Sequence, residues 1–172
     1  MTPFRRWLNI ITEGTHDHEH QRELNRTGYW GAKGAGCIVL ARTTGRILLA
    51  HRSAYVEQPH TWGGWGGAID PNENPEEAAR REISEECGYH GHFDIIPLYV
   101  FKAPSGSFRY YNFLAIVDEE FSPTLDWENQ GFEWVEYGSW PSPLHFGLKA
   151  LFADHDSDAV IRHAIENAVD KN

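Results

Sequence analysis

The chain has 172 residues, of which 41% are hydrophobic and 13% aromatic. This length and composition suit one globular domain with a sizeable core and argue against a largely disordered chain. The formal net charge is -10, which disfavours binding to duplex nucleic acid, because such binding depends on Lys and Arg contacts to phosphate. An anionic ligand therefore needs local compensation, which a divalent cation would supply.

Cysteine content and the lack of long apolar runs indicate the compartment. The chain contains two cysteines, Cys37 and Cys87, so a disulfide framework is not supported and a reducing environment is expected. Residues 1–14 lack the continuous apolar stretch of a secretory signal, and no run approaches the about 20 apolar residues of a membrane span. We therefore expect a cytoplasmic protein without a membrane partner.

Residues 1–27 are expected to form an arm or extension of a domain that spans residues 28–172. This arm carries alternating histidines, His16, His18 and His20, whose spacing would place them on one side of a strand. Their acidic and polar neighbours favour a solvated segment over a metal site. The oligomeric state stays open, and a homodimer in which the arm covers a partner subunit is one arrangement.

Strand patterns dominate the first part of the domain and return after the central helix. Residues 34–52 read as two apolar strands around a turn at residues 43–46. Two more strands are expected within residues 94–121, joined by a Pro/Gly/Ser turn at residues 104–107, and another within residues 131–138. These strands predict a sheet.

Helix signals are strongest between Asn74 and Gly88. Asn74 is a good N-cap, a proline follows at the first helical position, and Gly88 is a suitable stop, so a helix is predicted over residues 75–87. Apolar residues keep helical spacing in residues 143–155 and 158–171. Together with the strands, these helices predict an α/β fold in which helices cover a mixed sheet.

Three carboxylates share one side of the central helix. Glu82, Glu85 and Glu86 stand at i, i+3 and i+4, where like charges repel. An ordinary solvated acidic face would account for them. The alternative is a site for hard divalent cations, because Mg²⁺ takes oxygen ligands and would relieve the repulsion.

The residues around these carboxylates decide between the two interpretations. From Gly67 to Tyr89 the chain follows the pattern G-x5-E-x7-R-E-I-x-E-E-x-G-Y. This pattern resembles the signature of the Nudix hydrolases at every charged and glycine position. The departure is Tyr89, where the family usually has an aliphatic residue, and tyrosine preserves bulk and β-propensity. The resemblance implies the family's α/β/α sandwich with a mixed sheet.

The resemblance also implies a role for each position of the signature. One or more Mg²⁺ ions, or Mn²⁺, would be bound by four residues: Gly67 through its carbonyl, Glu82, Glu85 and Glu86. Glu73 and Arg81 would pair to hold the loop against the helix, a role that suits a bidentate contact between arginine and a carboxylate. Arg81, Glu82 and Glu85 would therefore belong to the catalytic machinery.

The general base is expected in the helix or in a later loop. Some family members carry a glutamate about six residues before a strand tryptophan, as metal ligand or base, and Glu128 fits that position before Trp134. An exposed loop acid is the alternative for Glu128, and Glu82 is then the first candidate for the base. Glu133, beside Trp134, is expected to be structural.

Residues outside the signature would choose the substrate. Arg52, Lys102 and Arg109 are the basic candidates for contacts to phosphate. Trp62 and Trp65 would lie in the core or stack on a base, with Trp65 kept as a candidate substrate contact. The remaining aromatic candidates for stacking are Tyr110, Tyr111 and Phe113.

The resulting hypothesis is a Mg²⁺-dependent pyrophosphohydrolase acting on a nucleoside diphosphate linked to another moiety, such as ADP-ribose or an NDP-sugar. Pro104 follows the signature by fifteen residues and resembles a proline marker of ADP-ribose pyrophosphatases, although a simple turn proline is the alternative. A second enzyme hypothesis is hydrolysis of (d)NTPs with release of pyrophosphate. A catalytically silent nucleotide-binding regulator is a third, and we expect such a protein to lose the signature's carboxylates.

Overall fold

The computed structural model describes residues 33–56, 58–103 and 108–169. The predicted arm, with its three histidines, and Pro104 lie outside these residues, so the predicted domain boundary remains a prediction. The described residues form seven strands and three helices: β1 (Lys33–Ala41), β2 (Ile47–Arg52), β3 (Trp62–Gly63), β4 (Trp65–Ala68), α3 (Pro75–Cys87), β5 (Asp94–Lys102), β6 (Arg109–Val117), β7 (Asn129–Val135), α4 (Phe146–Ala153) and α5 (His155–Val169).

The strands form one mixed sheet. Its order is β3-β2-β1-β6-β5, and in addition β4 pairs with β1 and β7 pairs with β2. β1 and β6 run parallel, whereas β1 and β2 form the predicted antiparallel hairpin, with Val39 opposite Leu48. The turn between them is closed by a 2.8 Å hydrogen bond from the Gly45 N–H to the Ala41 carbonyl.

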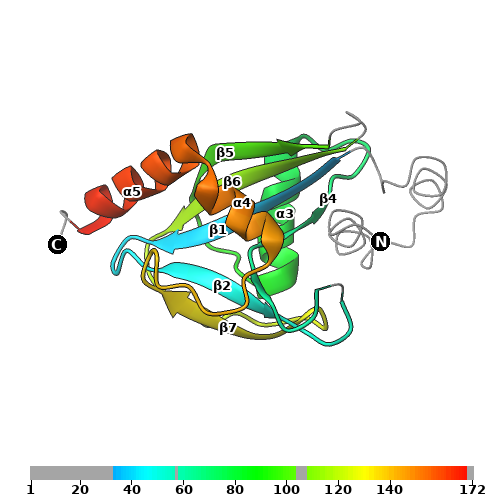
Figure 1. Cartoon of the computed structure of the whole chain (residues 1–172), viewed down its shortest axis with the longest axis horizontal. Coiled ribbons are helices and arrows are strands. Elements are labelled where there is room, and N and C mark those ends of the chain that lie inside the picture. Colours follow the sequence, from blue (N-terminus) through cyan, green and yellow to red (C-terminus); the bar gives the residue numbers. More distant parts are fainter. Residues whose placement is uncertain (1–32, 57, 104–107, 170–172) are drawn as a thin grey trace.

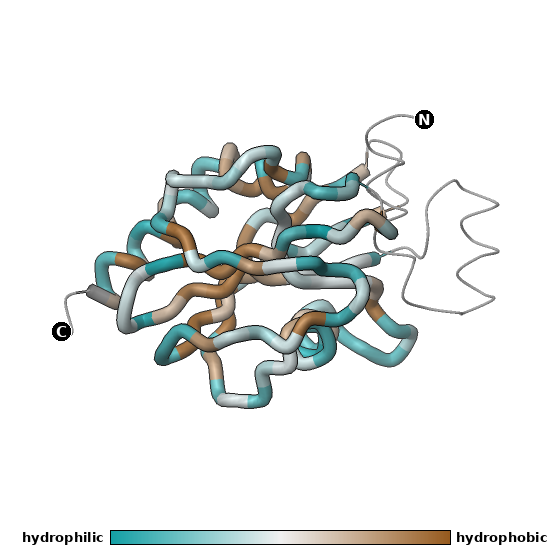
Figure 2. The backbone as a smooth tube through the Cα atoms, turned by 90° about the horizontal axis from the view of Figure 1, so that it is seen from below, coloured by the Kyte–Doolittle hydropathy of each residue, from teal (hydrophilic) through white to brown (hydrophobic). Residues whose placement is uncertain are grey.

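The central strands are buried on both faces. Along β1, Cys37 and Val39 belong to one hydrophobic cluster, and Ile38 and Leu40 belong to another. This alternation has the two-residue period of a strand. α3 packs on the first face, while α4 and α5 cover the second (Figure 1). Figure 2 shows the hydrophobic segments gathered in the middle of the molecule. The predicted α/β/α sandwich is confirmed.

The central helix α3 has the predicted bounds. The Asn74 side chain accepts a hydrogen bond from the Glu77 N–H at 2.9 Å, and the Glu77 carboxylate accepts one from the Asn74 N–H at 2.9 Å. This reciprocal capping satisfies two N–H groups that a helix start would leave unpaired. Gly88 ends the helix with φ 67°, a left-handed conformation that glycine adopts without strain.

The segment from Trp62 to Ala68 contains two short strands, β3 and β4, which the sequence analysis did not predict. β4 pairs with β1 over positions where both strands carry small residues, for example Gly67 opposite Ala35. This pairing brings the residues that precede α3 against the middle of the sheet.

Two expectations about cysteines and membranes can also be compared with the structure. Cys37 and Cys87 are both buried and both are free thiols. Cys87 lies on the apolar side of α3, where its Sγ contacts the Ile83 carbonyl at 2.8 Å. Among the helices that the structure describes, none is long and apolar enough to cross a membrane.

Candidate active site

The three carboxylates of α3 differ in exposure. Glu82 and Glu86 face the sheet and are buried, at 9% and 6% exposure, whereas the Glu85 side chain is 59% exposed. Glu86 accepts a 2.7 Å hydrogen bond from the Gly66 N–H of β4. A side chain at residue 67 would collide with the Glu82 carboxylate, so only glycine permits this approach. The helix therefore presents two buried carboxylates to the backbone of β4.

Arg81 ties this helix to the strand and loop before it. Its Nε and Nη2 donate to the two oxygens of Glu73 at 2.7 and 3.1 Å, and Nη2 also donates to the Ala68 carbonyl at 2.9 Å. Nη1 donates to Glu82 at 2.9 Å and to Glu85 at 3.0 Å. The predicted pairing of Glu73 with Arg81 is confirmed, and these contacts make Arg81 a positioning residue.

Glu86 meets two further carboxylates that come from the loop before β7. One oxygen each of Glu86, Asp126 and Glu128 lie within 4.8 Å of one another. Asp126 also accepts a 3.0 Å hydrogen bond from the Glu128 N–H, and Ser53 donates its N–H to the Glu128 carbonyl at 2.8 Å. These bonds fix the loop. The structure thus brings Glu128 to the α3 carboxylates, as the sequence suggested, and adds Asp126.

Asp126 is a residue that the sequence analysis missed. It stands two residues before Glu128 in a loop, and this close spacing of two acids was the available signal. Their convergence on Glu86 depends on the contact of this loop with the end of α3, where Thr124 donates its N–H to the Cys87 carbonyl at 2.9 Å. The hydrogen bond from the Glu128 N–H to the Asp126 side chain closes a local turn. The spacing of the two acids alone did not predict this turn.

Burial and mutual repulsion make the carboxyl groups of Glu82, Glu86 and Asp126 hard to ionise in the absence of a cation. Burial, opposed in part by Arg81, raises the pKa of Glu82 to about 7. Burial, with added repulsion from Glu82, Glu128 and Asp126, raises the pKa of Glu86 well above its ordinary value. Burial likewise raises the pKa of Asp126. A divalent cation would reverse these effects, because it favours the charged form of each neighbour.

The donor set fits a hard divalent cation. Its members are all oxygen ligands, which suit Mg²⁺ and Mn²⁺. Glu86, Asp126 and Glu128 could together hold such an ion, whereas Glu82 lies against Gly67, and the predicted ligand roles of Glu82 and the Gly67 carbonyl remain predictions. Glu85 is more exposed and contacts Arg81, so its role as a ligand remains a prediction.

A polar cavity adjoins Glu86. Its volume is about 60 Å³, and it runs between the sheet and α4. Five polar side chains besides Glu86 line it: Arg52, Tyr110, Asn112, Asn129 and His145. Arg52 is 8% exposed, so the structure holds a nearly buried cation next to the carboxylates. Arg52 was predicted to contact phosphate, and its position in this cavity is consistent with that role.

His145 faces the same cavity as a neutral side chain. Its Nδ1 accepts a 3.0 Å hydrogen bond from the Gly147 N–H at the start of α4. The proton of the neutral ring is therefore carried by Nε2. Burial, together with the positive charge of Arg52, holds the pKa of His145 well below its usual value. The sequence analysis gave no indication of this residue.

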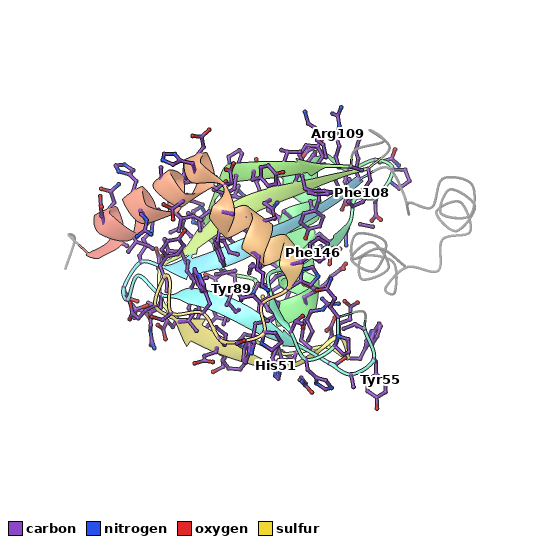
Figure 3. All side chains as sticks on the ribbon, in the orientation of Figure 1. His51, Tyr55, Tyr89, Phe108, Arg109 and Phe146 are labelled. Atoms are coloured by element: carbon purple, nitrogen blue, oxygen red, sulfur yellow. The ribbon has the colours of Figure 1, made fainter. Side chains whose placement is uncertain are left out.

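Three other predicted substrate contacts do not join this group. Lys102 and Arg109 face each other at the ends of β5 and β6, are exposed, and do not line the cavity; Figure 3 shows Arg109 at that end of the sheet. Trp65 is 0% exposed, and its Nε1 donates to the Leu48 carbonyl at 3.2 Å. Of the two alternatives for Trp65, the structure supports the core position, because the pairing of β4 with β1 encloses this side chain.

The remaining aromatic candidates divide between core and cavity. Tyr111 and Phe113 pack with the hydrophobic cluster on the α3 face. Tyr110 points to the other side of β6, as strand alternation requires, and lines the cavity.

Known proteins similar to this chain include two that are provisionally named 8-oxo-dGTP diphosphatases. The one from Mycobacterium tuberculosis is 45% identical over 64 residues, which cover 35% of this chain and 30% of the relative. The one from Bacillus subtilis is 32% identical over 109 residues, which cover 63% of this chain and 69% of the relative. The match to the first relative thus spans less than a third of its length.

Solved structures with the same fold are more distant in sequence. The Escherichia coli dihydroneopterin triphosphate pyrophosphohydrolase has a TM-score of 0.56 and 18% identity, with 79% of this chain and 96% of that chain covered. The Caenorhabditis elegans Ap4A hydrolase has a TM-score of 0.52 and 20% identity, with 76% and 93% covered. The family model for the NUDIX domain matches residues 31–154, which contain the signature and all seven described strands. The chain therefore belongs to the Nudix family.

Proposed function

We propose that this chain is a divalent-cation-dependent pyrophosphohydrolase that cleaves a diphosphate bond in a nucleotide. The observation that supports the proposal is the convergence of Glu86, Asp126 and Glu128 within 4.8 Å, beside the buried Glu82 of the signature helix. So many carboxylates in one place repel one another unless a cation joins them. A bound Mg²⁺ would neutralise the diphosphate and make a water molecule more acidic.

The chain's own residues then divide the remaining work. Glu128 is proposed to accept the proton of the water that attacks phosphorus, since its carboxylate lies across from the α3 carboxylates in the fixed loop. Arg52 is proposed to contact a phosphate oxygen from the cavity side. Arg81 positions Glu82 and the β4 backbone. The bond between phosphorus and the bridging oxygen breaks, and the leaving phosphate keeps that oxygen.

Two substrate classes are compatible with this site. The sequence analysis favoured an ADP-ribose-like compound because Pro104 resembles a proline marker of ADP-ribose pyrophosphatases. Pro104 lies outside the described residues. Two relatives bear names that assign them to 8-oxo-dGTP hydrolysis, and these names favour a nucleoside triphosphate. We therefore place (d)NTPs first and ADP-ribose or NDP-sugars second. A silent nucleotide-binding regulator is disfavoured because every carboxylate of the signature is present.

A substrate panel with identified products tests the proposal. kcat/KM is measured at equal Mg²⁺ for dGTP, 8-oxo-dGTP, the other dNTPs, ADP-ribose, NDP-sugars and dinucleoside polyphosphates. A triphosphate enzyme yields a nucleoside monophosphate and pyrophosphate, whereas ADP-ribose yields AMP and ribose 5-phosphate. A preference of about 100-fold, equivalent to about 2.7 kcal/mol at the transition state, assigns the class. Binding of nucleotides without turnover at saturating Mg²⁺ would refute hydrolysis in favour of a regulator.

A further inference from the structure

The loop before β7 carries two carboxylates of the cluster but has no regular secondary structure. Residues 118–128 connect β6 to β7 without forming a helix or a strand, so contacts with other elements must hold them in place. At the start of the loop, Arg46 donates to both oxygens of Glu120, at 2.7 and 2.8 Å. At its end, the Ser53 N–H donates to the carbonyl of the last loop residue. The middle of the loop, residues 121–126, is held by other contacts.

The middle of the loop lies antiparallel to the end of α3. Three successive contacts join the two segments: Glu86 with Asp126, the Cys87 carbonyl with the Thr124 N–H at 2.9 Å, and Tyr89 with Phe121. Residue numbers rise along the end of α3 while they fall along the loop. Because the three contacts share one register, a displacement of the loop along α3 would disturb all of them together. The approach of Asp126 to Glu86 therefore depends on the aromatic contact at the other end.

Phe121 contacts both the end of α3 and β7. Its ring centroid lies 4.5 Å from that of Tyr89 and 5.7 Å from that of Trp134, which it meets edge-on. Trp134 Nε1 also donates to the Phe121 carbonyl at 3.0 Å. The Tyr89 hydroxyl donates to the His92 carbonyl at 3.1 Å, which orients the tyrosine ring. All three rings are partly buried against the hydrophobic cluster on the α3 face.

Tyr89 is also the position at which the chain departs from the signature. An aliphatic residue there would bring no ring against Phe121. Aromatic pairs stabilise a contact beyond the apolar area that they bury. Tyrosine at this position thus gives the loop a contact with the end of α3 that the usual residue would not provide.

We propose that Tyr89 is a positioning residue, which through Phe121 holds the loop before β7 in the register that brings Asp126 to Glu86. The proposal rests on the function proposed above, because it takes these carboxylates as the site of the cation that hydrolysis requires. Tyr89 acts through the loop and supplies no ligand, since its ring contacts Phe121 and its hydroxyl contacts the His92 carbonyl. Loss of the ring contact should loosen the loop and thereby weaken cation binding.

A general role in the core is the alternative, and two amide groups separate it from a role in the loop. Tyr89 also meets Phe93, with ring centroids 6.1 Å apart, and that contact stabilises the fold without touching the loop. The Thr124 N–H reports on the loop, because its hydrogen bond joins the loop to the end of α3. The His145 N–H, which donates to the Trp62 carbonyl at 2.8 Å, reports on another part of the fold.

Amide hydrogen exchange of the metal-free protein, followed by NMR, compares Tyr89→Leu, Phe121→Leu and Tyr89→Phe with the wild type. In both leucine variants, exchange of the Thr124 N–H should accelerate about 10-fold relative to exchange of the His145 N–H, because local opening of the loop becomes easier. Tyr89→Phe retains the ring and should match the wild type. The double leucine variant should resemble the single variants, because the two side chains form one contact.

Tyr137→Leu is the matched control. Tyr137 is another half-buried tyrosine with two aromatic neighbours, Trp140 and Phe152, and its hydroxyl donates to Asp158 at 2.7 Å. It packs with the hydrophobic cluster on the opposite face of the sheet. Tyr137→Leu should therefore destabilise the fold without changing the ratio of the two exchange rates.

Binding of Mn²⁺ alone measures the consequence for the carboxylates. The decrease of the free-ion signal in electron paramagnetic resonance gives the dissociation constant without nucleotide or turnover. Tyr89→Leu and Phe121→Leu should weaken Mn²⁺ binding about 10-fold, as expected when a group that supports a metal ligand is lost. Tyr89→Phe and Tyr137→Leu should bind Mn²⁺ as the wild type does.

Three results would overturn the proposal. Wild-type exchange and Mn²⁺ affinity in Tyr89→Leu would show that the ring contact does not hold the loop. Equal acceleration of exchange at Thr124 and His145 would make Tyr89 a general core residue. Weaker Mn²⁺ binding without faster exchange at Thr124 would mean that Tyr89 does not act through the loop. Because no readout uses turnover, a wild type that binds Mn²⁺ but hydrolyses no nucleotide would refute the proposed function and not this inference.

Discussion

The ion pair between Arg81 and Glu73 should stabilise the folded protein several times more than the neighbouring pair between Arg80 and Glu76. Arg81 grips both oxygens of Glu73, at 2.7 and 3.1 Å, and the two side chains are 25% and 19% exposed. Arg80 meets Glu76 at 3.0 Å, with side chains 41% and 51% exposed. The first pair spans a loop, and the second is an i,i+4 pair on one helix.

The expected energies follow from this difference in geometry and exposure. Hydrogen bonds to charged groups contribute about 1.5 to 3 kcal/mol, and a pair that is mostly shielded from water keeps much of that value. We therefore expect a coupling of about 2 kcal/mol for Arg81 with Glu73. An exposed i,i+4 pair contributes about 0.3 to 0.5 kcal/mol, which is the value expected for Arg80 with Glu76.

Two double-mutant cycles measure these couplings. Arg81→Ala, Glu73→Ala and the double variant form one cycle, and Arg80→Ala, Glu76→Ala and their double variant form the other. Urea unfolding at pH 7 gives the free energy of unfolding of each protein, and the cycle cancels contacts that each residue makes with third groups, such as the cation–π contact of Arg80 with Phe93. Equal couplings in the two cycles would refute the view that Arg81 holds the loop against α3.

Three further predictions concern the cluster. Because burial raises the pKa of Glu82 to about 7 and that of Glu86 well above its ordinary value, the metal-free native state binds more protons than the unfolded chain. Its free energy of unfolding should therefore fall as pH rises from about 5 to 8, and saturating Mg²⁺ should remove this fall. Thermal unfolding across this pH range measures the effect, and a flat profile without metal would contradict it. Gly67→Ala should push the Glu82 carboxylate away and weaken Mg²⁺ binding about 10- to 100-fold, as measured by calorimetry. Unchanged Mg²⁺ affinity would show that binding does not require the close contact between Glu82 and Gly67. Glu128→Gln should lower kcat about 10²- to 10⁴-fold with little change in KM, whereas an effect on KM alone would make Glu128 a binding residue.

Local signals in the sequence were enough to predict α3. The N-cap at Asn74, the proline after it and the left-handed Gly88 act within a few residues of one another, so the bounds follow from nearby chemistry. The alternation of β1 likewise shows which side chains face each layer. Glu73 and Arg81 could be paired because the family resemblance supplied what spacing alone did not.

Features that depend on distant pairing were not predictable in the same way. Trp65 lies in the core because β4 pairs with β1, and its neighbours in the sequence did not distinguish a core position from a stacking position. Asp126 reaches Glu86 because the loop before β7 lies beside the end of α3, where Thr124 donates its N–H to the Cys87 carbonyl. His145 joins Arg52 at a cavity between the sheet and α4, elements far apart in the chain. The positions of Trp65, Asp126 and His145 therefore follow from tertiary contacts and not from local sequence.

The turnover of Glu86→Gln tests the central claim, that buried carboxylates on α3 hold the cation that hydrolysis requires. The substitution preserves the shape of the side chain and removes the carboxylate that lies within 4.8 Å of Asp126 and Glu128. Hydrolysis of dGTP and ADP-ribose is followed over a range of Mg²⁺ concentrations, with circular dichroism to verify folding and Glu76→Gln as a control on the exposed start of the same helix. Glu86→Gln should lower kcat at saturating Mg²⁺ by at least about 100-fold, and Glu76→Gln should retain wild-type turnover. Comparable Mg²⁺-supported turnover in a folded Glu86→Gln protein would contradict the account.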